Sequence, residues 1–253
     1  MEQKEIYVRS TLDGSEQPSL FYASASKEKR PLLVGLHTWS YDRFNQIENM
    51  LPFAEEQDFH LLLPEFRGPN VPKKNPKFTE ACGSELAKQD IKDAIDYVLR
   101  EYDNVDAENV FLLGASGGGH MALLMAGFCP EIFRVIGAFV PITDLAKWAE
   151  QSEHYGKQVR ACCGESEEEM AKRSPVSYSD TVAKANLKIF HGKYDKTVPV
   201  THSISFYNAL MEKYPASRVF LDIFDGGHEM PMKPATEWIL SQYQGRENKT
   251  VTG

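Results

Sequence analysis

Apolar stretches of strand length alternate with helix-like stretches along most of this 253-residue chain, and this alternation restricts the fold more than any other feature. The stretches that indicate strands are "RPLLVGLH", "FHLLLPEFRG", "NVFLLGA", "RVIGAFVPI", "LKIFHGKYD" and "RVFLDIFDGGH". Strands that are apolar on both faces and separated by helices are typical of a parallel sheet covered on both sides. The sequence therefore predicts an α/β fold with a mostly parallel, twisted β-sheet, helices on both faces and functional residues after the strands.

Helices are expected between these strands, and one longer segment interrupts the rhythm. The expected helices cover residues 45–57, 85–102, 117–128, 201–214 and 233–244. An antiparallel hairpin with an Asp-Gly turn is expected near the N-terminus. Residues 143–184 are a polar, helix-like insertion, which we interpret as a small lid or pocket wall, with a plain surface excursion as the alternative. We expect residues 1–253 to form one domain that ends in a frayed tail.

Charge and composition exclude several classes of partner. The formal net charge of -8 argues against nucleic acid and anionic membranes, which need a cationic face. The N-terminus lacks the apolar core of a signal peptide, and no window approaches the ~18 apolar residues of a membrane span. We therefore expect a cytoplasmic protein, or a secreted one if a leader has been trimmed. The four cysteines lack CxxC spacing, so we expect reduced thiols, no metal and no cofactor, while the oligomeric state stays open.

The stretch "GASGG", residues 114–118, fits the pattern G-x-S-x-G between an expected strand and an expected helix. In this pattern the serine, here Ser116, stands on a tight and strained turn, and small neighbours let the strand approach the helix. The helix N-terminus then offers a backbone N–H to a developing oxyanion. A phosphate loop fits poorly, since neither the Walker nor the dinucleotide pattern is complete. A purely structural turn stays the alternative for this motif alone.

Two later residues supply the partners that a serine nucleophile needs. A serine hydroxyl requires a histidine base, which is itself held by a carboxylate. His228 in "DGGHEM" follows the last expected strand, and Asp195 in "HGKYDKTVP" follows the strand before it. The order Ser116, Asp195, His228 is the order that α/β-hydrolases use. The sequence therefore predicts a catalytic triad on an α/β-hydrolase fold.

The loop "HTWSYD" after the first apolar strand is expected to complete the site. The backbone N–H of Trp39 is the first choice for an oxyanion donor beside that of Gly117, and Thr38 is the second choice. Thr38, Tyr41 and Trp148 are the expected lining of the substrate pocket.

Together, "LHTWS", "EFRG", "GASGG", "CCGESEEEMAKRSPVSY", "HGKYDKTVP" and "GGHEM" resemble the catalytic domain of prolyl-oligopeptidase-type (S9-like) hydrolases and related stand-alone esterases. The resemblance covers nearly the whole chain. It implies that Ser116 is the nucleophile, Asp195 the acid and His228 the base, with Trp39 and Gly117 as oxyanion donors. The chain departs from the His-Gly-Gly loop of many esterases, because "HTW" stands there. The propeller of true oligopeptidases is not expected within these 253 residues.

The function expected from the sequence is hydrolysis of small carboxylic esters by a serine hydrolase through an acyl-enzyme intermediate. A small S9-like peptidase or aminopeptidase is the alternative within the same chemistry. A third alternative is a binding protein that keeps the fold without catalysis.

Overall fold

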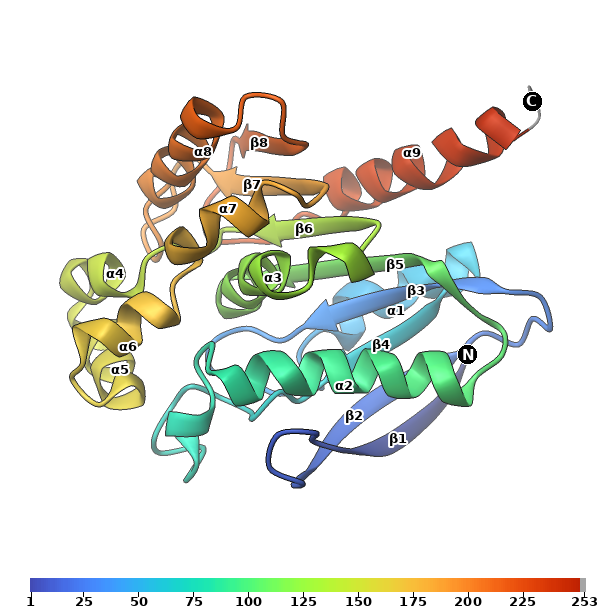
Figure 1. Ribbon diagram of the computed structural model, residues 1–253, viewed down its shortest axis with the longest axis horizontal. Helices are drawn as coiled ribbons and strands as arrows, with labels where there is room; N and C mark the ends of the chain where they lie inside the picture. Colours follow the sequence, from blue (N-terminus) through green and yellow to red (C-terminus); the bar gives the residue numbers. More distant parts are fainter. Residues whose placement is uncertain (251–253) are drawn as a thin grey trace.

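Eight strands form one sheet within residues 1–250, the part of the chain that this computed structural model describes. Their order across the sheet is β1-β2-β4-β3-β5-β6-β7-β8 (Figure 1). The strands are β1 Glu2–Arg9, β2 Glu16–Ala23, β3 Arg30–Leu36, β4 His60–Pro64, β5 Val105–Ala115, β6 Val135–Phe139, β7 Leu187–Gly192 and β8 Val219–Phe224. β1 and β2 pair antiparallel with their neighbours, and the other pairs are parallel. The predicted mostly parallel sheet is confirmed.

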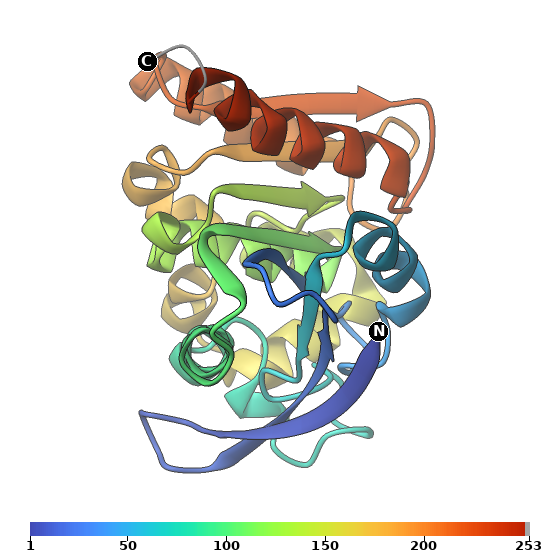
Figure 2. The ribbon, with the colours of Figure 1, turned by 90° about the vertical axis from the view of Figure 1, so that its right-hand side faces the viewer.

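Helices cover both faces of the sheet (Figures 1 and 2). α2, α3 and α8 contribute apolar side chains to the core on one face, and α1 and α9 contribute to the core on the other. The helices are α1 Ile47–Gln57, α2 Glu85–Glu101, α3 Gly117–Phe128, α4 Leu145–Gln151, α5 Glu153–Cys163, α6 Glu167–Lys172, α7 Ser179–Val182, α8 Thr201–Lys213 and α9 Met232–Thr250. The central strands are buried on both faces, which explains their unbroken apolar sequences.

The insertion forms the helices α4 to α7 between β6 and β7. Ser152 caps α5 by accepting a hydrogen bond from the Tyr155 N–H, and Ser166 caps α6 in the same way. The apolar sides of α4 and α5 pack into a third hydrophobic cluster, separate from the two cores on the sheet. This cluster includes Trp39, so the insertion is built against the loop after β3.

None of the helices within the described residues has the length and apolar character needed to span a membrane. The single domain and the cytoplasmic location stay predictions. α9 extends through Thr250, so residues 246–250 continue a helix where a frayed tail was expected, and the last three residues of that tail lie outside the described part.

Ion pairs around the buried Arg67 join the hairpin turn to the loop after β4 and to α2. The guanidinium of Arg67 follows β4 and lies 2.8 Å from carboxylate oxygens of both Asp13 and Glu80, and it also pairs with Asp90 of α2. The side chains of Arg67 and Asp90 are 2% and 1% exposed, so the Asp90 carboxylate depends on Arg67 for charge compensation.

We expect Arg67→Leu to lower the free energy of unfolding by about 3–5 kcal/mol, because the substitution leaves the buried Asp90 carboxylate without its partner. Urea unfolding measures the change. Arg100→Leu is the matched control, since the Arg100–Glu101 pair is exposed and contributes at most about 1 kcal/mol. Equal losses in the two variants would contradict a supporting role for the network.

Candidate active site

Ser116 occupies the turn between β5 and α3 with a strained backbone. Its φ of 56° and ψ of -117° lie where residues with a side chain are rarely found. Its N–H donates to the carbonyl oxygen of Phe139 at 2.9 Å, which ties the turn to β6. The residue is 9% exposed, so the turn presents a buried hydroxyl at the carboxyl edge of the sheet.

Glycines allow the close approach that this turn requires. A Cβ atom at Gly114 would collide with the carbonyl oxygen of Gly118, and one at Gly118 would collide with that of Leu36. A Cβ at Gly117 would lie 2.5 Å from the backbone nitrogen of Trp39. Strand β5, helix α3 and the loop after β3 therefore meet at distances that side chains would prevent.

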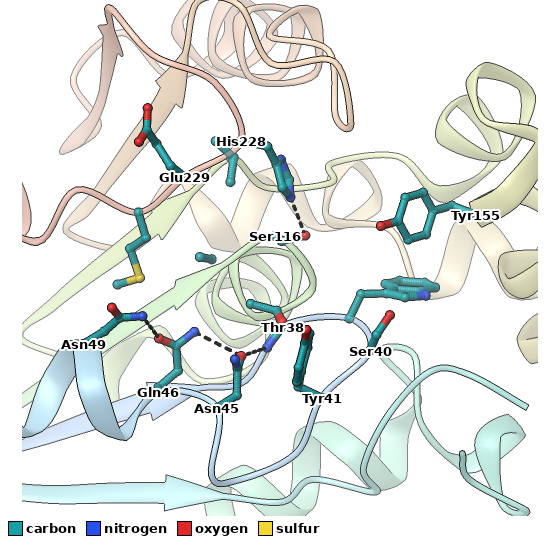
Figure 3. Close-up of a pocket in the computed structure, with 14 residues that line it drawn as sticks. Thr38, Ser40, Tyr41, Asn45, Gln46, Asn49, Ser116, Tyr155, His228 and Glu229 are labelled. Carbon is teal, nitrogen blue, oxygen red and sulfur yellow. Dashed lines mark hydrogen bonds between the residues drawn. The ribbon is translucent and has the colours of Figure 1, made fainter. Parts of the chain in front are cut away.

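His228 lies between Ser116 and Asp195, and Figure 3 shows its hydrogen bond with the serine. Its Nδ1 is 2.7 Å from Oδ2 of Asp195, and its Nε2 is 2.9 Å from Oγ of Ser116. A carboxylate only accepts hydrogen bonds, so Nδ1 carries the proton and Nε2 is free to accept from the serine hydroxyl. The three residues come from loops after β5, β7 and β8, and the structure brings them together in the arrangement a nucleophilic serine needs.

The Asp195 carboxylate is held ionised. Burial by itself raises the pKa of Asp195, but hydrogen bonds from His191, His228 and the Val198 N–H outweigh it and hold the pKa well below the usual value. Oδ1 accepts from the N–H groups of Thr197 and Val198 at 2.8 and 3.0 Å. A charged carboxylate at this place both orients His228 and stabilises its protonated form.

The structure separates the two candidates for the second oxyanion donor. The Thr38 N–H donates to Oδ1 of Asn45 at 3.0 Å, so it is already engaged. The Trp39 N–H has no hydrogen-bond partner among the described residues and lies beside Gly117. Its indole Nε1–H donates to Gln158 of α5 at 2.8 Å, and its ring packs edge-on against Trp148. Trp39 is therefore the better-placed donor.

A hollow of about 290 Å³ opens beside Ser116. Thr38 and Tyr41 line it, as expected. Trp148 does not line it, because its side chain is fully buried beneath Trp39 and Tyr155 and its indole donates to the Thr197 carbonyl oxygen. Tyr155 stacks on Trp148 and is the residue of the insertion that lines the hollow. Its hydroxyl is directed toward Ser116 in Figure 3.

Three amide side chains that were not predicted from the sequence also line the hollow: Asn45, Gln46 and Asn49. They stand just before and within the first turn of α1. Polar residues at the beginning of a helix are common, so the sequence contains no signal that they face Ser116. No group of His, Cys, Asp or Glu suited to a metal ion occurs in the described part of the chain.

His120, one turn into α3, is fully buried and serves the scaffold. Its Nε2–H donates to the carbonyl oxygen of Arg173 at 2.6 Å, which connects the nucleophile helix to the end of the insertion. Burial, together with the nearby cations of Lys88 and Arg173, lowers the pKa of His120 from 6.5 to about 4. The residue is therefore neutral near neutral pH.

Comparisons with known proteins indicate the family and the fold of the chain. The sequence pattern of the prolyl oligopeptidase family matches residues 45–243, a range that contains Ser116, Asp195 and His228 but not Trp39. Acylamino-acid-releasing enzyme 2 of Oryza sativa subsp. japonica is 24% identical over 228 residues, which are 83% of this chain and 29% of that enzyme. The acylamino-acid-releasing enzyme of Mus musculus is 26% identical over 217 residues, 78% of this chain and 28% of that enzyme.

A solved structure of Pyrococcus horikoshii acylaminoacyl peptidase, in its orthorhombic crystal form, is similar with a TM-score of 0.75 and 22% identity. The likeness covers 96% of this chain and 40% of that chain, and it shows a shared α/β-hydrolase fold. The chain spans less than half the length of each of these relatives.

We expect the free energy of unfolding to fall as the pH drops from 6.5 to about 4, because the unfolded chain protonates His120 in this interval and the folded chain does not. The contribution of this residue is roughly 2–3 kcal/mol. His120→Gln keeps a donor for the Arg173 carbonyl oxygen but does not titrate, so the variant should lose less stability over the same interval.

Urea unfolding at several pH values measures the difference. His154→Gln, at an exposed position on α5, is the control and should follow the native protein. An equal fall for the native protein and His120→Gln would show that His120 does not contribute to this loss of stability.

Proposed function

The chain belongs to the prolyl oligopeptidase family, and on that basis we propose that it is a serine hydrolase that uses Ser116, His228 and Asp195 as its catalytic triad. The observation that carries the proposal is the pair of hydrogen bonds of His228, 2.9 Å to the serine Oγ and 2.7 Å to the aspartate Oδ2. A binding protein needs neither the strained serine turn nor a base within reach of it.

The geometry supports an acyl-enzyme mechanism. Oγ of Ser116 attacks the substrate carbonyl carbon while Nε2 of His228 accepts its proton. The backbone N–H groups of Trp39 and Gly117 stabilise the resulting oxyanion, and the Asp195 carboxylate stabilises the imidazolium. His228 then protonates the leaving group, and water repeats the attack on the acyl-enzyme with His228 as the base.

The relatives favour the peptidase alternative over the carboxylesterase that the sequence suggested first, since both curated relatives are acylamino-acid-releasing enzymes. We therefore propose small N-acylated aminoacyl compounds as the substrate class, with simple esters as easier substrates of the same site. The hollow of about 290 Å³ has room for a group of this size.

The position of the carboxylates supports a substrate whose amino group is acylated and therefore uncharged. An aminopeptidase needs a carboxylate to bind the substrate ammonium group. Glu229 is the one carboxylate among the described residues that line the hollow. It accepts a hydrogen bond from the Gly227 N–H at 3.1 Å, and in Figure 3 its carboxylate points away from Ser116. Glu65, Glu80 and Glu85 are the other carboxylates that could be considered from the sequence, but they do not line the hollow and each pairs with a cation.

We expect Ser116→Ala to lower kcat for p-nitrophenyl acetate by about a millionfold and to abolish labelling by a fluorophosphonate probe, because among the described residues Ser116 supplies the hydroxyl that is hydrogen-bonded to His228. Asp195→Asn should lower kcat by about 10⁴-fold while leaving Ser116 in place. Turnover by Ser116→Ala at the native rate would refute the triad, and a native protein that resists the probe would favour the binding-protein alternative.

We further expect the protein to cleave N-acetylalanine p-nitroanilide in preference to alanine p-nitroanilide, since Glu229, the one carboxylate among the described residues that line the hollow, points away from Ser116. The measurement is the ratio of kcat/KM for the two anilides. Preference for the free amine would support an aminopeptidase, and cleavage of esters alone would return the assignment to a carboxylesterase.

A further inference from the structure

Three amide side chains form a row along one side of the hollow, across from Tyr155 (Figure 3). Asn45 and Gln46 precede α1, and Asn49 lies in its first turn. Gln46 is 2% exposed, which is unusual for a polar side chain in the lining of an open hollow. The three amides are not part of the triad. The hydrogen bonds that they make show which of their donors and acceptors are left for a substrate.

One backbone group sets the direction of all three amides. The Thr38 N–H can only donate, so the atom of Asn45 that lies 3.0 Å from it is the carbonyl oxygen Oδ1. Gln46 approaches the same oxygen at 3.4 Å and must therefore present its Nε2 donor. The Gln46 oxygen then faces Asn49, whose Nδ2 donates to it at 3.0 Å. The main chain thus fixes the orientation of the whole row.

The amide group of Asn45 is left with unused donors. Its Oδ1 accepts two hydrogen bonds, whereas its Nδ2 has no partner among the described residues. The side chain is half-buried and lines the hollow beside Ser116. An amide donor that a substrate covers must find an acceptor, or it loses the hydrogen bonds that water supplied.

The charges around the hollow determine which acceptor fits. No Lys or Arg occurs among the described residues that line it, and Glu229 adds a negative charge at its rim. A substrate carboxylate would meet no cation there. A neutral carbonyl oxygen needs only a neutral donor, and Asn45 supplies one.

We propose that Asn45 is a substrate-binding residue whose Nδ2–H donates to a neutral carbonyl oxygen in the acyl part of the substrate, such as the oxygen of an N-acyl group. This proposal rests on the proposed function of the same site. Gln46 is a positioning residue, because it touches Asn45 and helps to hold its oxygen toward Thr38. Oδ1 of Asn45 also accepts the hydrogen bond of the N–H of Thr38, the residue before Trp39. The residue proposed to bind the substrate carbonyl oxygen therefore also helps to hold the loop that carries the proposed oxyanion donor.

The test compares two esters that differ by one carbonyl oxygen, p-nitrophenyl 4-oxopentanoate and p-nitrophenyl pentanoate. The extra carbonyl group stands at the position of the acetyl carbonyl in N-acetylglycine. Asn45→Asp keeps the oxygen that faces Thr38 and replaces the amide donor with an acceptor. We expect the ratio of kcat/KM, oxo ester over plain ester, to fall about tenfold in this variant.

Asn208→Asp is the matched control, because Asn208 is exposed on α8 and does not line the hollow; its ratio should equal that of the native protein. A ratio in Asn45→Asp that equals the native ratio would overturn the proposal. Should this variant not fold, Asn45→Ser removes the same donor and is judged by the same ratio. Failure of the proposed function is distinct, since the native protein would then hydrolyse neither ester.

Discussion

Strand β5 and helix α3 meet at a distance that only glycine allows, and the positions of Ser116 and of the proposed oxyanion donors follow from that meeting. A side chain at Gly114 or Gly118 would strike the backbone of the neighbouring segment. The close approach goes with a positive φ at Ser116, on the turn that presents its hydroxyl at the carboxyl edge of the sheet. It also brings the first N–H of α3 beside Trp39. One steric requirement therefore places both the nucleophile and the proposed oxyanion donors.

Much of the fold could be predicted from the sequence, because strands buried on both faces leave unbroken apolar stretches. Ser116, Asp195 and His228 could be proposed as partners because each follows a strand, and the carboxyl ends of parallel strands share one edge. Trp148 was misplaced because an aromatic residue in an amphipathic insertion can face the core or the solvent. Its packing against Trp39 and Tyr155 is a tertiary contact that spacing does not encode.

The amide row was out of reach for a related reason. Asn45, Gln46 and Asn49 are ordinary residues for the beginning of a helix, and their convergence on the hollow depends on the direction in which α1 leaves the loop after β3. That direction is set by contacts such as the bond between Thr38 and Asn45. Local sequence patterns identify helices and strands. Which side chains line a pocket depends on how those helices and strands are oriented relative to one another.

The bond from the Trp39 indole to Gln158 has a consequence for how this protein loses activity. Trp39 belongs to the hydrophobic cluster of the insertion and not to either core on the sheet. Segments with a small core of their own can open locally at a lower free energy than the whole domain. Each such opening would release the proposed oxyanion donor, and it would also loosen Thr197 and Val198, whose N–H groups hold the Asp195 carboxylate. Heat or denaturant would then inactivate the protein before the sheet unfolds. Activity would measure the fraction of molecules in which α4 and α5 are packed against Trp39.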